Sequence, residues 1–110
     1  MSGMTSEQTR ETLKRLRTGL DELYGPRLDG VFLFGSYARN DFGPESDLDV
    51  LIVLDQVEDY GAEIERTSQL IGALSLKCGV SISRIFLSRE SWDRSQSAFI
   101  QNVREEAVPA

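Results

Sequence analysis

The chain has 110 residues, about 40% of them apolar and 27% charged, which suits one compact globular domain rather than a disordered segment. The 18 acidic and 12 basic residues give a net charge of −6, and this balance argues against a nucleic-acid polymer or an anionic membrane as the main ligand. The longest apolar runs, 31–34 and 50–54, are far too short to cross a bilayer, and the polar N-terminal segment lacks the apolar stretch of a signal peptide.

Reactive side chains are few. The sequence contains no histidine, which excludes Ser-His-Asp and Cys-His nucleophilic machinery and the usual histidine-containing zinc sites. Any bound metal is therefore expected to be a hard cation with oxygen ligands. Cys78 is the only cysteine, so no intrachain disulfide can form and a reducing compartment, the cytoplasm, is expected. We interpret Cys78 as a partly buried residue near a helix end rather than a reactive thiolate.

The first predicted element is an amphipathic helix. Thr5 and Gln8 have the spacing of a capping box at its start. Leucines recur every three or four residues and are expected to share the inward face, and the helix is expected to end before Gly25. These leucines are Leu13, Leu16, Leu20 and Leu23.

The rest of the chain alternates apolar runs with helical patterns. The expected elements are strands at 30–34, 47–54 and 80–87, a short helix beginning at 36–40, a helix over 60–77, a short helical segment at 88–92 and a last helix from Phe99 to Pro109. The 60–77 helix lies between two apolar strands, which suits a crossover on one sheet face. The pattern predicts one α/β (α+β) domain over residues 1–110, a small sheet covered by helices.

Helical spacing also assigns apolar side chains to the core. In the 60–77 helix these are Ile64, Leu70, Ile71 and Leu74, with Gly79 as the C-terminal stop. Near the end of the chain, Trp92, Phe99 and Ile100 are interpreted as core residues, with a partner-binding patch as the alternative.

Two aspartates open the second strand. Asp47 and Asp49 lie two residues apart, so their side chains are expected on one face, while Leu48 and Val50 face the core. An acidic pair beside an apolar strand is costly unless it is solvated or neutralised. Mg²⁺ fits this pair, because it takes one or two carboxylates together with water and phosphate oxygens. The plain alternative is that Asp47 caps the strand and Asp49 is exposed at an edge.

A small-residue turn lies twelve residues upstream of the acidic pair in the pattern G-S-x10-D-x-D. Gly35 and Ser36 follow a strand and precede a helix, where free backbone N–H groups and a hydroxyl can receive an anion. If the two strands are neighbours, the turn and the aspartates share one rim of the sheet. Such a rim can hold a polyphosphate at both ends.

The stretch "GSYAR…SDLDVLIVL" resembles the core signature of the polymerase-β-like nucleotidyltransferases, in particular the minimal nucleotidyltransferase (MNT) proteins. The resemblance covers roughly residues 28–88 and implies the small mixed sheet of that fold. The matching positions are Gly35, Ser36, Arg39, Ser46, Asp47 and Asp49. In that superfamily the Gly-Ser turn grips a nucleoside triphosphate, the aspartates hold one or two Mg²⁺ ions, and a nucleoside monophosphate passes to a hydroxyl with release of pyrophosphate.

Site roles follow from this resemblance. Asp47 and Asp49 are expected as catalytic metal ligands, and Gly35 and Ser36 as contacts of the ATP phosphates. Arg39 is expected either to contact the triphosphate or to form an ion pair with an acidic neighbour. The remaining motif residues are Ser46, expected as a nucleotide-binding residue that also hydrogen-bonds locally before the strand, and Tyr37 and Ala38, expected to pack.

One feature departs from the family pattern. A third carboxylate is usual on a later strand, but Ser81 and Ser83 occupy the expected positions, Arg84 follows them and Glu90 lies beyond the strand. Loss of a general base costs typically 10²–10⁴-fold in rate, yet a loose transition state tolerates a weak base. A nucleotide-binding pseudoenzyme is therefore the alternative to an active transferase.

The chain is also too short for the acceptor-binding domain of larger nucleotidyltransferases. The resemblance implies that another protein presents the acceptor: in the minimal family, a HEPN-domain toxin that its antitoxin adenylylates on tyrosine. The expected function is thus Mg²⁺-dependent transfer of AMP from ATP to a HEPN partner. The alternatives are neutralisation of that partner by complex formation and, less favoured, modification of a small molecule such as an antibiotic.

Overall fold

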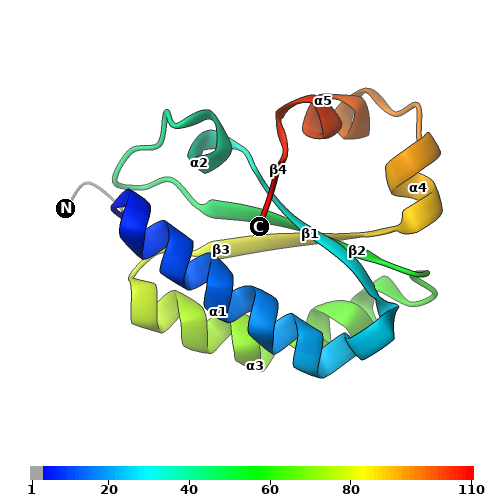
Figure 1. Ribbon diagram of the computed structural model, residues 1–110, viewed down its shortest axis with the longest axis horizontal. Coiled ribbons are helices and arrows are strands. Elements are labelled where there is room, and N and C mark those ends of the chain that lie inside the picture. The colour runs from blue at the N-terminus through cyan, green and yellow to red at the C-terminus, as the bar shows by residue number, and fades with distance from the viewer. Residues whose placement is uncertain (1–3) are drawn as a thin grey trace.

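The computed structural model describes residues 4–110 and contains a four-stranded sheet with helices on both faces (Figure 1). The elements in chain order are α1 (Ser6–Tyr24), η1 (Gly25–Arg27, a 3-10 turn), β1 (Leu28–Phe34), α2 (Ser36–Arg39), β2 (Leu48–Leu54), α3 (Tyr60–Cys78), β3 (Ile82–Ser88), α4 (Arg89–Arg94), α5 (Ala98–Glu106) and β4 (Val108–Pro109).

The sheet is mixed, with strand order β3-β2-β1-β4. β1 and β2 are antiparallel, whereas β2 and β3 are parallel and are joined by the α3 crossover. This arrangement confirms the predicted fold class. The two-residue β4 strand was not predicted; it pairs with β1 at Phe32 and Leu33.

The start of α1 follows the prediction, whereas its end does not. The Thr5 hydroxyl accepts from the Gln8 N–H and the Gln8 side chain accepts from the Thr5 N–H, which confirms the capping box. Leu16 and Leu20 are fully buried, but Leu23 is 42% exposed, so its inward assignment is wrong. Tyr24 takes the last inward position instead and donates its hydroxyl hydrogen to Glu63 at 2.8 Å.

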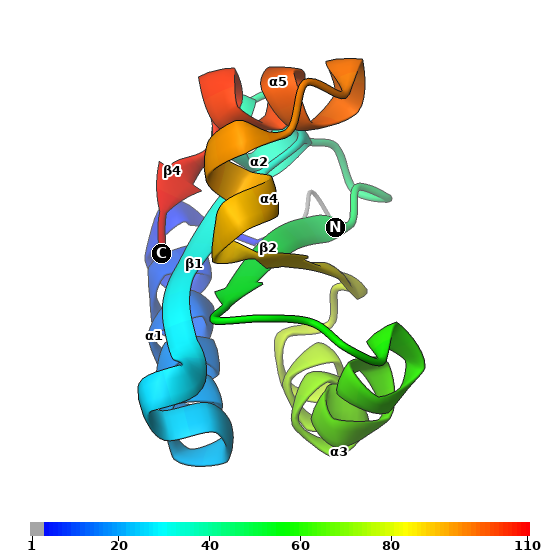
Figure 2. The same cartoon turned by 90° about the vertical axis from the view of Figure 1, so that its right-hand side faces the viewer.

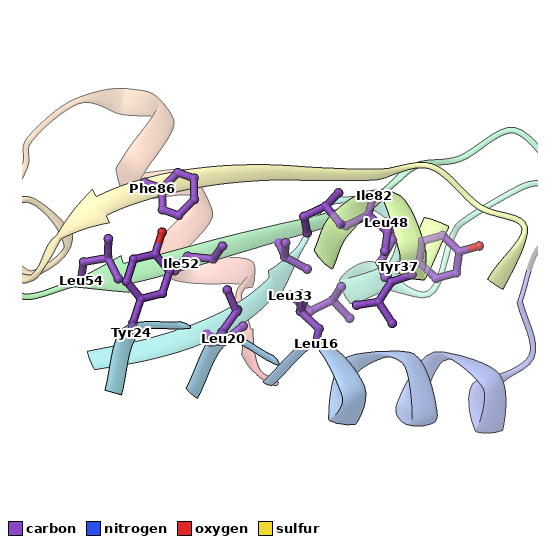
Figure 3. Close-up of a cluster of buried hydrophobic side chains, with 14 of the residues drawn as sticks. Leu16, Leu20, Tyr24, Leu33, Tyr37, Leu48, Ile52, Leu54, Ile82 and Phe86 are labelled. Carbon is purple, nitrogen blue, oxygen red and sulfur yellow. The ribbon is translucent and has the colours of Figure 1, made fainter. Parts of the chain in front are cut away.

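One face of the sheet is covered by α1 and α3. Figure 3 shows Leu16, Leu20 and Tyr24 of α1 pointing at side chains of all three long strands. Leu48 is fully buried in this layer, as is Val50, which confirms that they face away from the acidic pair. The layer's buried members are Met4, Leu16, Leu20, Tyr24, Val31, Leu33, Tyr37, Leu48, Val50, Ile52, Leu54, Ile71, Leu74, Ile82 and Phe86; Leu13, Ile64, Leu70 and Cys78 pack partly buried against them.

The opposite face carries α4 and α5, as Figure 2 shows from the side. Its smaller core contains Leu51 and Val53 from β2, together with Trp92 and Val103 from the helices. Trp92 is buried and its ring centroid lies 4.9 Å from that of Phe32, so the core assignment of Trp92 is confirmed. Phe99 is 55% exposed, and its core assignment is wrong.

A buried carboxylate joins α1 to α3. Glu63 accepts from the Tyr24 hydroxyl, from Arg27 at 3.2 Å and from Arg66 at 3.0 Å. Burial alone raises the pKa of Glu63, but these donors outweigh it and the net pKa lies below the usual value. The C-terminal end of α1 is thereby fixed to the first turn of α3.

Within residues 4–110, no helix combines the length and apolar character required to span a bilayer.

Candidate functional site

The acidic pair and the Gly-Ser turn meet at one end of the sheet. Phe34 of β1, Asp49 of β2 and Ser83 of β3 are register partners, so they form a row across three strands. Directly paired residues share a sheet face, and this row lies on the α4–α5 face, one step beyond the apolar row that contains Leu51. Asp47 precedes β2 at the same rim, and its Oδ2 atom lies 3.4 Å from the Ser83 hydroxyl. The predicted sharing of one rim is confirmed.

Gly35 packs directly against the Asp49 carboxylate. Its backbone has φ 75° and ψ −156°, a conformation that is essentially restricted to glycine. A Cβ atom at this position would lie 2.2 Å from Oδ2 of Asp49. The glycine is therefore required twice, by its backbone angles and by the carboxylate beside it.

The packing of Tyr37 fixes the short α2 helix in place. Tyr37 is buried and stacks on Phe42 with ring centroids 4.1 Å apart and planes at 9°. The Tyr37 hydroxyl accepts from the Met4 N–H at 3.3 Å, and Asn40 ends the helix in the left-handed region. The predicted packing role of Tyr37 is confirmed, and it leaves Ser36 at the rim.

The electrostatics of the rim favour a cation. The pKa of Asp49 is raised by burial first, then by the charges of Asp47 and Glu106, while Arg39 acts in the opposite direction. The two carboxylates held at this rim form a donor set of the kind that Mg²⁺ takes, with its remaining coordination positions left to water and phosphate. Asp47 and Asp49 are the candidate ligands, and among residues 4–110 no group of three or more His, Cys, Asp or Glu side chains shares a metal-binding arrangement.

Arg39 is paired with two carboxylates. Its Nε lies 3.2 Å from Oδ2 of Asp41 and its Nη1 lies 2.7 Å from Oε2 of Glu106. Of the two roles expected for Arg39, the structure thus contains the ion pair. Glu106 was missed by the sequence analysis, because its partner lies 67 residues away and no local pattern marks it.

Ser46 closes the loop that leads into β2. Its hydroxyl accepts from the Gly43 N–H at 2.8 Å, and its own N–H donates to the Gly43 carbonyl at 3.2 Å. The predicted local hydrogen bond is confirmed. These contacts hold the chain immediately before Asp47.

The third strand places no acid in the rim row. Ser83 occupies the position beside Asp49, and Ser81 precedes the strand and accepts from the Leu48 N–H. Arg84 points to α3, where its Nε donates to the Thr67 hydroxyl at 2.7 Å. Glu106 of α5 is a further carboxylate whose charge acts on Asp49, but it is paired with Arg39.

Comparison with known proteins agrees with this geometry. The sequence matches the nucleotidyltransferase domain family over residues 13–104. The chain belongs to this family and is a nucleotidyltransferase by class, which confirms the predicted resemblance to the minimal nucleotidyltransferases.

Two proteins of Methanocaldococcus jannaschii are similar over most of their length. The one named "Putative protein adenylyltransferase MJ0604" is 38% identical over 97 residues, which cover 87% of this chain and 91% of the relative. The one named "Putative protein adenylyltransferase MJ0141" is 32% identical over 98 residues, covering 89% and 94%.

Solved structures share the fold. A toxin–antitoxin crystallised with AMP-PNP has a TM-score of 0.63 at 20% identity, over 87% of this chain and 69% of the other. A nucleotidyltransferase-like protein from Sulfolobus solfataricus has a TM-score of 0.61 at 23% identity, over 94% and 82%. A crystal structure of the toxin–antitoxin MntA-HpeT has a TM-score of 0.55.

Proposed function

We propose that this protein transfers AMP from ATP, in a Mg²⁺-dependent reaction, to a hydroxyl group of a HEPN-domain toxin, with tyrosine as the acceptor. The observation that carries the proposal is the packing of the Gly35 turn onto the Asp49 carboxylate at a rim that also holds Asp47. A turn suited to phosphate and a carboxylate pair suited to a cation are the two parts that nucleotidyl transfer requires.

Different groups of the protein position different parts of the triphosphate. The backbone N–H groups and the hydroxyl at Gly35 and Ser36 bind the β- and γ-phosphate oxygens. The acceptor oxygen then forms a bond to the α-phosphorus, the bond from that phosphorus to the bridging oxygen breaks, and pyrophosphate leaves. The hydrogen bond of Tyr37 supports the segment that follows Gly35, and the hydrogen bond of Ser46 supports the loop that leads to Asp47.

Asp47 and Asp49 would hold the metal. When it is bound, Mg²⁺ offsets the negative charge of the triphosphate and of the two carboxylates. The raised pKa of Asp49 supports this role, because a cation stabilises the ionised carboxylate that burial and Asp47 disfavour.

Strand β3 provides no carboxylate that could accept the proton of the acceptor hydroxyl. Ser83 stands in the rim row and is exposed, so the proton passes to solvent at this open edge. Since the transition state of phosphoryl-type transfer is loose, a weak base suffices, at a cost of typically 10²–10⁴-fold in rate. We therefore expect slow transfer.

The choice of a protein acceptor is supported by the relatives. Two are named as protein adenylyltransferases, and the structural neighbours include toxin–antitoxin complexes. The rim is also open on the side of Asp47 and Ser83, both exposed, which leaves room for an acceptor presented from outside the chain.

The test incubates the protein and its candidate partner with Mg²⁺-ATP and measures the intact mass of the partner. The wild type should add whole AMP units, and Asp47→Ala should abolish the addition. Glu58→Ala is the matched control, because it removes an exposed acid beyond the opposite end of β2. An unmodified partner in the wild-type reaction would reject the proposal.

A second function is favoured by one observation, the absence of an acid from the rim row on β3. In this alternative the protein neutralises the toxin by occlusion and the nucleotide is an optional ligand. The double variant Asp47→Ala/Asp49→Ala would then still form the complex and still protect cells. Complex formation without protection would contradict occlusion.

A further inference from the structure

Phe99 is the exposed aromatic residue beside the rim. Its side chain is 55% exposed, whereas Ile100 and Val103 of the same helix pack into the core. The Phe99 ring therefore has surface available for contact with another molecule.

The Phe99 ring contacts Phe34 and keeps a free surface. It makes an edge-to-face pair with Phe34, with centroids 6.4 Å apart and planes at 86°. In this geometry Phe34 covers at most one face of the Phe99 ring. The 55% exposure of the side chain leaves aromatic surface open to a ligand.

The location connects this ring to the nucleotide site. Phe34 directly precedes Gly35 and is the register partner of Asp49, so Phe99 lies one aromatic contact away from the candidate phosphate and metal site. The other end of α5 is tied to the α2 segment through Glu106 and Arg39 at 2.7 Å. Helix α5 therefore contacts the β1–α2 segment near both of its ends, and Figure 2 places α5 beside α2.

We infer that Phe99, backed by Phe34, is the stacking surface for the base of the nucleoside triphosphate. This inference rests on the proposed function, and it assigns the part of the nucleotide that the Gly35 turn and the aspartates leave unbound. Every base offers a π-face, and stacking on an aromatic ring is a general way to bind it. An aromatic face selects for a large flat base and against a bare polyphosphate.

The test compares direct binding of ATP and of inorganic tripolyphosphate, in the presence of Mg²⁺, by titration calorimetry. Phe99→Ala should weaken ATP binding by about 5- to 100-fold, equivalent to roughly 1–3 kcal/mol, and leave tripolyphosphate binding unchanged. Leu76→Ala is the control, because Leu76 is an 88% exposed apolar residue on α3. It should change neither affinity.

A conservative variant guards against a folding effect. Phe99→Trp should restore ATP binding, and its fluorescence should change on addition of ATP but not of tripolyphosphate. The signal of the buried Trp92 is measured in the wild type and subtracted.

Three results would overturn the inference. Equal losses for ATP and tripolyphosphate would assign Phe99 to the shape of the phosphate site. Unchanged ATP affinity of Phe99→Ala would reject this inference alone, and weaker binding of the protein partner by the same variant would make Phe99 a docking residue. If the wild type binds no ATP, both this inference and the proposed function fail.

Discussion

At the scale of single residues, Gly35 combines two requirements for glycine: one set by its backbone angles and one set by the side chain packed against it. Its backbone angles exclude other residues, and its missing Cβ gives the Asp49 carboxylate its place. Gly25 also has a positive φ, of 55°, but a Cβ there would meet nothing within 4 Å. Gly43 has neither constraint. Gly35, Gly25 and Gly43 therefore have two, one and none of these constraints, respectively.

We predict that Gly35→Ala lowers the free energy of unfolding by at least about 2 kcal/mol and abolishes ATP binding, because backbone strain adds to the clash with Asp49. Gly25→Ala should cost roughly 1–2 kcal/mol from strain alone and keep ATP binding. Gly43→Ala should be nearly neutral. Urea denaturation and calorimetric titration measure both quantities, and normal ATP binding by Gly35→Ala would contradict the assignment of the turn.

Asp49 is expected to serve function at the expense of stability. Its raised pKa means that the folded chain holds the Asp49 proton more tightly than the unfolded chain does. As the pH rises above the ordinary value of 3.8 and through the folded pKa, the wild type loses stability relative to a variant that stays neutral.

We therefore predict that Asp49→Asn is more stable than the wild type at pH 7 in metal-free buffer but inactive in AMP transfer. The stability gain should shrink as the pH falls through the folded pKa and below 3.8, where the carboxyl becomes protonated in the unfolded chain as well as in the folded one. Denaturation midpoints between pH 3.5 and 7 test this with roughly half-unit steps. A gain that is independent of pH would show that Asp49 is not the titrating group.

At the scale of elements, α5 is attached to the rim by one charged and one aromatic contact. The charged contact, between Arg39 and Glu106, bears on the two roles expected for Arg39. An ion-pair role depends only on opposite charges, whereas a triphosphate contact requires a cation at position 39 itself.

A charge exchange distinguishes these roles. If the ion pair positions α2, Arg39→Glu and Glu106→Arg should each weaken ATP binding several-fold, and the double variant should recover most of it. If Arg39 contacts the triphosphate, the double variant should bind as poorly as Arg39→Glu alone. ATP titration of the four proteins at one ionic strength gives the answer, since exposed pairs are sensitive to salt.

The elements also show how far sequence patterns reach. Periodicity predicts the three long strands and the two long helices, because each buries a continuous face and its apolar spacing is local. The same reasoning fails for Leu23 and Phe99, where exposure is decided by what the neighbouring element covers. It also misses β4, because two residues ending in proline carry no strand pattern of their own.

The site likewise contains some features that the sequence predicts and others that it does not. The G-S-x10-D-x-D spacing places the turn and the acidic pair on one rim, because antiparallel pairing of adjacent strands fixes their meeting. Glu106 beside Arg39 and the buried Glu63 between α1 and α3 could not be predicted, since each depends on partners distant in the chain. Neither lies in a motif.

At the scale of the whole molecule, ligand binding and folding are coupled, because the rim is assembled from β1, α2 and β2 and does not exist in the unfolded chain. We predict that Mg²⁺-ATP at about 100 times its Kd adds roughly 2.7 kcal/mol of stability and raises the Tm by about 10 °C. Differential scanning calorimetry measures the shift.

The variants sharpen this test. Asp47→Asn should lose most of the increase in Tm, whereas Glu58→Gln, at the far end of β2, should retain it. A wild-type Tm unaffected by Mg²⁺-ATP would argue against a nucleotide site at this rim.

The pairing of β4 with β1 has a consequence for synthesis of the chain. β1 leads into the Gly35 turn early, yet its outer edge is completed by Val108 and Pro109, and α2 gains the Glu106 contact only when α5 has formed. A ribosome-bound chain that has exposed the turn and both aspartates therefore still lacks this support. Competence to hold a nucleotide should therefore arise only after the segment 98–109 has left the exit tunnel and packed against β1 and α2.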